Sequence, residues 1–232
     1  MDQRRAVLFD MDGIVFESEA LHLASWGAVV ARYGAPPPLL EEQTPFIGRR
    51  ARDFAAYLVE TRRLPLSADQ LLVEKQTAFS EILRRERVRP RPGLLTLLRR
   101  VERLGAVPAV ASSGTRRHVS LVLDRLGLSH RFADIVTGDD VERAKPDPAV
   151  FLVAARRVGV APERCLVVED APPGVTAARA AGMTVVAVPC AETRHLDFRH
   201  ADLVLDHLGE LTTRRLRALL GLESAASRAK RA

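Results

Sequence analysis

Ala6-Val7-Leu8-Phe9-Asp10-Met11-Asp12-Gly13 is the segment on which the prediction of the fold depends. An apolar run that ends in Asp-x-Asp-Gly predicts a buried strand with two carboxylates at its carboxyl end. The side chains of Asp10 and Asp12 start on the same face, because alternate residues of a strand point to the same side. Such a pair suits a divalent cation, or a nucleophile with an acid/base partner. Asp-x-Asp also occurs in turns and helix caps, so the motif alone leaves a structural alternative open.

A second apolar run, residues 107–111, ends in Ser112-Ser113-Gly114-Thr115 and passes into an amphipathic helix. Hydroxyl groups and free backbone N–H groups at the junction of a strand and a helix can hold phosphate oxygens. The same serines could merely cap the helix. Considered alone, the segment favours the interpretation that these serines cap the helix over the one that they bind phosphate.

Lys145 stands in the segment Ala144-Lys145-Pro146-Asp147-Pro148, and it is one of only three lysines in a chain that has 32 arginines. Basic positions are therefore filled almost everywhere by arginine. A compact ammonium differs from a guanidinium fork and can lie between a carboxylate and a phosphoryl oxygen. The alternative is a chance lysine ahead of a proline that starts a helix.

A further apolar run, which begins at Cys165, ends in Glu169-Asp170 and leads through a turn at Gly174 into an Ala-rich helix. Adjacent acids at a strand end repel each other unless a cation or a lysine neutralises them. Oxygen ligands from two strand ends favour Mg²⁺. Glu169 and Asp170 could instead cap the next helix, but that interpretation leaves the doubled charge unexplained.

Apolar runs alternate with amphipathic segments along most of the chain. This alternation predicts an α/β fold, a doubly wound parallel sheet with helices on both faces and polar groups gathered at the carboxyl ends of the strands. The predicted strands are Val7–Asp10, Val107–Ser112, Ile135–Thr137, Leu166–Glu169, Thr184–Val188 and Leu203–Leu205, and the helices between them are Leu94–Leu104, Arg116–Leu126, Ala149–Val158 and Val175–Ala181.

Residues 16–88 form a segment too long for one crossover between strands. Its pattern predicts helices over Ala20–Tyr33, Arg52–Thr61 and Ala68–Arg87, with Pro36-Pro37-Pro38 separating the first from the others.

The order of the four motifs, Asp-x-Asp, Ser, Lys and Glu-Asp, resembles that of the haloacid dehalogenase superfamily. Within it, the chain is similar to subfamily I, the branch of phosphatases and β-phosphoglucomutase-like enzymes that carry a small helical cap. The resemblance covers roughly residues 5–210. It implies a catalytic core of residues 1–15 and 89–222 with a Rossmann-like sheet, an inserted α-helical cap of residues 16–88, and a tail of residues 223–232 that we expect to be disordered.

The resemblance implies that Asp10 attacks phosphorus and forms an aspartyl-phosphate, that Asp12 is the acid/base, and that Lys145 offsets the carboxylates. It implies Mg²⁺ as the cofactor. The metal site is expected at Asp10, Asp12 (through its backbone carbonyl), Asp170 and Glu169. The candidates for binding phosphate or substrate are Ser112, Ser113, Lys145, Gly13 and Arg49.

The predicted function is Mg²⁺-dependent hydrolysis of a small phosphorylated metabolite, a phosphate monoester with sugar phosphates among the candidates. Asp12 argues against dehalogenation, since the dehalogenases of the superfamily lack an acid there. A sugar-phosphate mutase is the alternative, but Ile47 and Ala51 stand where β-phosphoglucomutases carry Lys and Arg. Arg49 or Arg52 could face the substrate instead. A phospho-accepting regulatory protein is a further alternative, although it would need neither an Asp12-type acid/base nor a cap.

The composition is that of an ordinary globular protein, with 232 residues, 47% hydrophobic and 28% charged. The net charge of +6 comes from arginines spread over many predicted helices, and without a nucleic-acid-binding motif it does not favour a nucleic-acid partner. We expect no membrane segment, because no apolar run approaches the length of a span. Two cysteines in or beside predicted strands suggest reduced thiols and a cytoplasmic location. We expect a monomer or a weak dimer.

Overall fold

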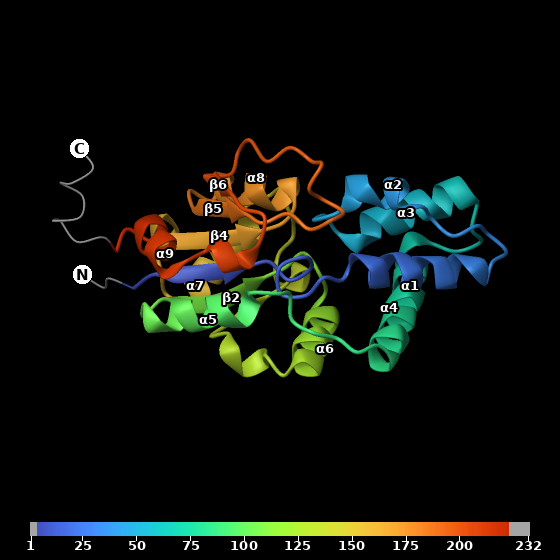
Figure 1. Cartoon of the computed structure of the whole chain (residues 1–232). Helices are drawn as coiled ribbons and strands as arrows, with labels where there is room; N and C mark the ends of the chain where they lie inside the picture. The colour runs from blue at the N-terminus through green and yellow to red at the C-terminus, as the bar shows by residue number, and fades with distance from the viewer. Residues whose placement is uncertain (1–3, 223–232) are drawn as a thin grey trace.

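One parallel sheet occupies the centre of the computed structural model, which describes residues 4–222 (Figure 1). In this part of the chain the sheet has six strands in the order β3-β2-β1-β4-β5-β6. This is the predicted α/β architecture. The strands are β1 (Ala6–Phe9), β2 (Val107–Ala111), β3 (Ile135–Val136), β4 (Cys165–Glu169), β5 (Thr184–Ala187) and β6 (Leu203–Val204).

Strand β1 lies in the middle of the sheet and all four of its residues are buried. Val7 and Phe9 pack into the core on one face, whereas Ala6 and Leu8 pack into the core on the other. In the register of the sheet, Phe9 pairs with residues 110 and 168 of the neighbouring strands. The chain segments that follow β1, β2 and β4 therefore emerge side by side at one edge.

Helices cover both faces of the sheet. On one face lie α5 (Leu94–Arg103), α6 (Arg116–Leu126) and α9 (Thr213–Leu219), and on the other lie α7 (Ala149–Arg157) and α8 (Pro172–Ala180). Each helix buries an apolar stripe on the sheet, as expected for amphipathic helices.

Four helices of the inserted segment lie beyond the carboxyl edge of the sheet (Figure 1). They are α1 (Glu19–Ala31), α2 (Leu40–Gln43), α3 (Ala51–Arg62) and α4 (Ala68–Arg85). They enclose a separate apolar cluster that includes Trp26, Phe54, Leu58 and Leu71. The segment therefore has its own core, as a cap would, and the division into core and cap domains stays a prediction.

The structure differs from the predicted elements in a few places. Helix α8 begins at Pro172, three residues before the prediction, because proline is well tolerated in the first turn of a helix. The short helices α2 and α9 were not predicted, since four and seven residues carry too little periodicity. The predicted tail of residues 223–232 lies outside the described residues.

The two cysteines, Cys165 and Cys190, are buried and free. Burial raises the pKa of each thiol to about 12, so neither is poised to react as a thiolate. Between residues 4 and 222, no helix combines the length and the apolar character needed to cross a membrane.

Candidate active site

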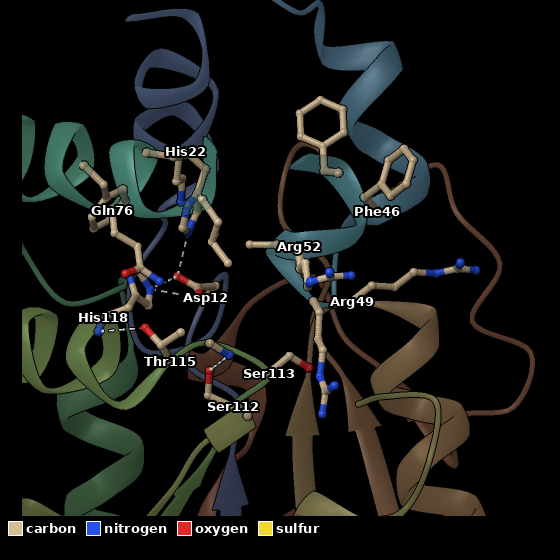
Figure 2. Close-up of a pocket in the computed structure, with 18 of the residues that line it drawn as sticks. Asp12, His22, Phe46, Arg49, Arg52, Gln76, Ser112, Ser113, Thr115 and His118 are labelled. Atoms are coloured by element: carbon tan, nitrogen blue, oxygen red, sulfur yellow. Dashed lines mark hydrogen bonds and ion pairs between the residues drawn. The ribbon is translucent and has the colours of Figure 1, made fainter. Parts of the chain in front are cut away.

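A pocket of about 450 Å³ lies where the carboxyl edge of the sheet faces helices α1, α3 and α4. Figure 2 shows His22, Gln76 and His118 around Asp12 on one side, and Phe46, Arg49 and Arg52 on the other. Ser112 and Ser113 lie between them near the end of β2. Asp10 and Asp170 also line this pocket.

Lys145 joins the ends of three strands. Its Nζ donates hydrogen bonds to Asp10 Oδ1, to Glu169 Oε1 at 2.8 Å and to the carbonyl of Ala111 at 3.0 Å. An ammonium has three protons, and each has an acceptor here. Its buried side chain thus holds β1, β2 and β4 at one point. The sequence prediction placed Lys145 beside the carboxylates, and the structure brings them together.

Three buried carboxylates, those of Asp10, Glu169 and Asp170, have oxygens within 4.8 Å of one another. Burial raises the pKa of Asp10 to about 8, despite the opposing effect of Lys145. Burial, with Glu169 and Asp10 nearby, holds the pKa of Asp170 well above its usual range. One lysine therefore does not neutralise the cluster.

The remaining oxygens of the cluster show where a cation fits. Glu169 Oε2 accepts the backbone N–H groups of Asp170 at 2.8 Å and Ala171 at 2.9 Å. Asp170 Oδ2, in contrast, is buried and has no hydrogen-bond partner among the described residues. An orphaned carboxylate oxygen in an all-oxygen donor set suits Mg²⁺. The residues present therefore fit the predicted metal.

Gly13 makes room for Asp170. A Cβ at Gly13 would lie 1.9 Å from Asp170 Oδ2, and the φ of +84° also favours glycine. Its N–H donates to the carbonyl of Phe16 at 2.8 Å, and its carbonyl accepts from the buried Arg91. Both backbone groups of Gly13 thus have partners within the protein, and its clear role in this structure is to leave room for Asp170. The phosphate-binding role of Gly13 stays a prediction.

Ser112 and Ser113 have different surroundings. Ser112 is buried at the end of β2, and its Oγ accepts the N–H of Gly114 at 2.9 Å. This leaves the Ser112 hydroxyl proton for a ligand in the pocket. Ser113 donates its only hydroxyl proton to the carbonyl of Gly48 at 3.1 Å. In this conformation the Ser113 hydroxyl cannot also donate to a phosphate, which differs from its predicted role.

Arg49 and Arg52 both line the pocket. The guanidinium of Arg52 pairs with Asp69, with Nε 2.5 Å from Oδ1 and a second hydrogen bond of 3.1 Å. No hydrogen bond or ion pair of the Arg49 side chain is found with any residue from 4 to 222. Of the two arginines, Arg49 is therefore the one with a free cation.

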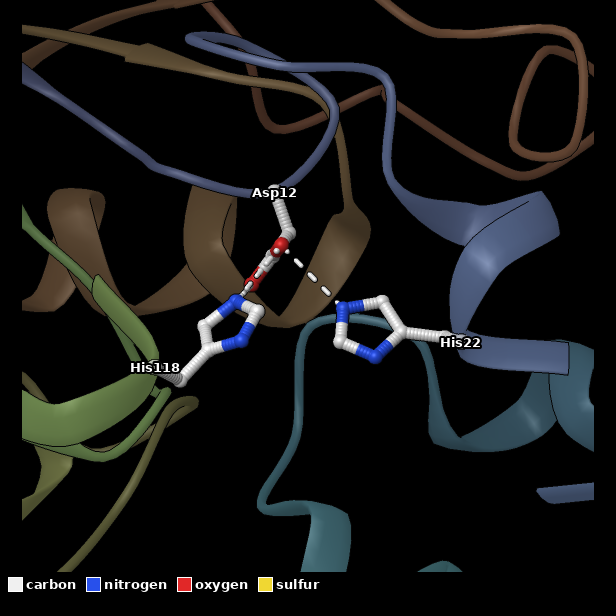
Figure 3. Close-up of side chains that lie close together, drawn as sticks. All are labelled: Asp12, His22 and His118. Atoms are coloured by element: carbon white, nitrogen blue, oxygen red, sulfur yellow. Dashed lines mark hydrogen bonds and ion pairs between the residues drawn. The ribbon is translucent and has the colours of Figure 1, made fainter. Parts of the chain in front are cut away.

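The carboxylate of Asp12 points toward two histidines, with which it forms a second group of close side chains (Figure 3). His22 Nε2 lies 3.2 Å and His118 Nε2 3.1 Å from Asp12 Oδ1. Ser18 donates to the same oxygen at 2.6 Å. Burial alone would raise the pKa of Asp12, but the contacts with His118 and His22 outweigh it and hold that pKa well below its usual range. Only the backbone carbonyl of Asp12 remains for the predicted metal.

A buried lysine extends this network. Lys75 Nζ lies 2.5 Å from His22 Nδ1, and burial lowers the pKa of Lys75 to about 8. Burial and the charge of Lys75 lower the pKa of His22 to about 4. His22, Lys75 and His118 were not among the residues predicted from the sequence. Lysine is scarce in this chain, and the scarcity that drew attention to Lys145 applies equally to Lys75. It was the one feature of the sequence that could have identified Lys75 as a candidate site residue.

The segment 46–50, which leads into α3, contacts the sheet edge at several points. Arg50 donates to the carbonyls of Val141 at 2.9 Å and Glu142 at 2.6 Å. Gly48 accepts from Ser113. A Cβ at Gly48 would lie 2.8 Å from the Cβ of Ala171, so this segment packs closely over the site.

Comparison with known proteins places these features in a family. A model described as haloacid dehalogenase-like hydrolase matches residues 4–182. The chain is 33% identical over 183 residues to fructose-1-phosphate phosphatase YqaB of Escherichia coli, covering 78% of this chain and 95% of that protein. It is 34% identical over 183 residues to a phosphoglycolate phosphatase of Xanthomonas campestris, covering 79% of this chain and 82% of that protein.

A solved structure is similar over the same extent. The crystal structure of CbbY from Rhodobacter sphaeroides in complex with phosphate superposes with a TM-score of 0.83 at 28% identity, covering 90% of this chain and 96% of that chain. The similarity includes the inserted helices as well as the sheet, because a match of 90% of the chain cannot omit a segment of this length.

Proposed function

The chain belongs to the haloacid dehalogenase-like hydrolases and is a phosphoric monoester hydrolase, and from this premise we propose that it is a Mg²⁺-dependent phosphatase of a small sugar phosphate or related metabolite. One observation carries the proposal. Asp10 is held by Lys145 beside an orphaned oxygen of Asp170, and Asp12, two residues on, faces the same pocket.

In the proposed reaction Asp10 is the nucleophile. Lys145 binds Oδ1, so we assign the attack on phosphorus to Oδ2. A bond forms between this oxygen and phosphorus as the bond from phosphorus to the leaving oxygen breaks. The product of this step is an aspartyl-phosphate on Asp10 and an alcohol.

Asp12 is the acid/base of both steps. It gives a proton to the leaving oxygen in the first step and takes one from water in the second. In that step the water oxygen attacks phosphorus, the bond from phosphorus to Asp10 Oδ2 breaks, and inorganic phosphate leaves with the Asp10 carboxylate restored. The contacts of His22 and His118 favour the ionised carboxylate, which is the form that accepts the proton of water.

Asp10, Asp170 and the backbone carbonyl of Asp12 would hold Mg²⁺, with Glu169 in support; when bound, the ion neutralises charge on the transferring phosphoryl group. Lys145 offsets the charges of Asp10 and Glu169. The hydroxyl of Ser112 donates to a phosphoryl oxygen.

The rest of the substrate would lie in the pocket of about 450 Å³, which favours a small molecule. Arg49 is the residue that we assign to a second polar or anionic group of the substrate, since Arg52 is engaged by Asp69. Relatives named for fructose 1-phosphate and phosphoglycolate support a substrate of this size.

Release of inorganic phosphate from a panel of compounds with Mg²⁺ tests the proposal. The panel holds sugar phosphates, glycerol phosphate, phosphoglycolate, nucleotides and β-glucose 1-phosphate, with Asp10→Asn as the control. We expect release from at least one small phosphate ester by the wild type and at least a 10³-fold lower rate in Asp10→Asn, since the nucleophile is lost. Release that persists in Asp10→Asn would contradict the mechanism. If no compound releases phosphate and β-glucose 1-phosphate is converted to its isomer, the protein is a sugar-phosphate mutase and not a phosphatase.

A further inference from the structure

Asp12, His22 and His118 make a second group of potential metal ligands, separate in chemistry from the carboxylate cluster. They come from three elements: the loop after β1, helix α1 and helix α6 (Figure 3). Their ligand atoms lie within 4.8 Å of one another, and both imidazoles present Nε2 to the same carboxylate oxygen. Their side chains are 24%, 15% and 9% exposed, so the group can be reached from the pocket that it lines.

The spacing of these atoms suits a tetrahedral ion. The two distances from Asp12 Oδ1, 3.2 Å to His22 and 3.1 Å to His118, are hydrogen-bond lengths in this structure. Ligands about 2.0–2.1 Å from a tetrahedral Zn²⁺ lie about 3.3 Å from one another. An ion could thus replace the two hydrogen-bond protons at the Asp12 oxygen, with the two imidazoles adjusting around it, and the site adjoins the pocket that all three residues line.

The donor atoms select the metal. Imidazole nitrogens suit Zn²⁺, Co²⁺ and other first-row transition ions, whereas Mg²⁺ prefers oxygen. Mg²⁺ would therefore favour the all-oxygen group of Asp10, Glu169 and Asp170, and a transition-metal ion would favour the mixed group around Asp12.

We propose that Asp12, His22 and His118 form a site for a transition-metal dication such as Zn²⁺, which bridges α1 to α6 and withdraws Asp12 from proton transfer. A metal on Asp12 leaves no carboxylate to give or take the proton, so Zn²⁺ inhibits the phosphatase; this consequence alone rests on the proposed function. Because α1 belongs to the inserted helices and α6 to the sheet layer, the ion also ties the two layers together.

Metal binding redistributes protons in a defined way. An ion on His22 Nε2 places the ring proton on Nδ1, which faces Lys75 at 2.5 Å. Lys75 then releases one ammonium proton to solvent and accepts the N–H of His22. On the His118 side the ring proton likewise moves to Nδ1. The loss of one proton from Lys75 offsets part of the charge that the dication brings.

Titration with Co²⁺ in millimolar Mg²⁺, followed by visible absorption, measures binding without any substrate. The variants are His118→Gln and, as the matched control, His200→Gln at an exposed histidine away from the pocket lining. We expect the wild type and His200→Gln to bind one Co²⁺ that Zn²⁺ displaces and excess Mg²⁺ does not. His118→Gln should weaken this binding more than about tenfold, since loss of even an outer ligand costs that much.

Nuclear magnetic resonance of the wild-type imidazole nitrogens gives a second measurement that needs no variant. One equivalent of Zn²⁺ should shift Nε2 of His22 and His118 and leave the other histidines unchanged. Equal Co²⁺ binding by His118→Gln, displacement of Co²⁺ by Mg²⁺, or Zn²⁺ shifts spread over the other histidines would each overturn the site. A chain that binds Co²⁺ as expected but hydrolyses no phosphate ester would refute the proposed function and leave the site intact.

Discussion

Lys75 and Lys145 are both buried in a chain that otherwise uses arginine at almost every basic position. Each lies where a single ammonium must fit into a small space, Lys145 between Asp10 and Glu169 and Lys75 against His22. A guanidinium is planar, wider and fixed in its fork, so it could not replace either one without moving its neighbours. The choice of lysine at these two positions thus follows from the local geometry.

Glu19 is a buried carboxylate whose titration should be visible in the stability of the protein. Its Oε2 accepts a hydrogen bond of 2.6 Å from Gln43, yet burial and the nearby Asp12 raise its pKa to about 7. Between pH 4.5 and 7 the folded chain holds a proton that the unfolded chain releases. The contribution of Glu19 to stability therefore falls as the pH rises through this window.

Glu19→Gln should remove this loss, because glutamine has no proton to release and can still accept from Gln43. The free energy of unfolding of Glu19→Gln minus that of the wild type should rise between pH 4.5 and pH 8 by up to about 3 kcal/mol. Urea unfolding of both proteins at the two pH values measures it. Glu41→Gln, at an exposed position of α2, is the control. A difference that does not change with pH would contradict the raised pKa.

At the scale of elements, the entry into α3 links the inserted helices to the sheet. Arg50 precedes the helix and donates to two carbonyls of residues 141 and 142, while Gly48 accepts from Ser113. These contacts place the segment 46–50 over the pocket with Arg49 in its wall. The position of Arg49 therefore depends on the hydrogen bonds of its neighbours.

Arg50→Ala should reduce kcat/KM for the best substrate of the panel by about tenfold, since two charge-assisted hydrogen bonds that position the segment are lost. Arg52→Ala is the matched control, because Arg52 lies two residues after Arg50, in the first turn of α3, and its guanidinium pairs with Asp69 of the inserted helices. We expect a smaller effect for Arg52→Ala. Steady-state kinetics of both variants tests this, and equal losses would show that the contact with residues 141 and 142 does not position the pocket.

At the scale of the molecule, the three-carboxylate cluster is located where the two central strands, β1 and β4, end. The repulsion among Asp10, Glu169 and Asp170 therefore acts on the most buried part of the sheet. A cation that binds there is expected to stabilise the whole fold rather than one loop.

Mg²⁺ should accordingly stabilise the folded chain, by about 2.7 kcal/mol at one hundred times its Kd. For a chain of this length, that free energy raises the Tm by roughly 5–10 °C. Asp170→Asn should melt at a higher temperature than the wild type without Mg²⁺, because an amide avoids the free energy of burying or protonating this carboxylate, and should show little response to the ion. Thermal melts of both proteins with Mg²⁺ or a chelator measure this. A wild-type Tm that is indifferent to Mg²⁺ would argue against the metal site.

The sequence alone was sufficient for the sheet and for the group around Lys145. Apolar runs that end in polar residues predicted the strands, and parallel strands necessarily bring their carboxyl ends to one edge. Asp10, Ser112 and Asp170 therefore had to lie near one another once the strands were placed. Lys145 lies in a loop before α7, and the resemblance to the family placed it beside them. Periodicity and strand ends are local features of a chain, so they can be predicted from the sequence without knowledge of the tertiary structure.

The tertiary structure alone decided which residues surround Asp12 and which arginine is free. His22 and His118 are 10 and 106 residues from Asp12, on helices whose packing no local pattern specifies. Ser113 bonds to Gly48 and Arg52 to Asp69 for the same reason. The direction of a side chain toward a distant partner depends on how the inserted helices pack against the sheet, and that packing is a property of the whole fold.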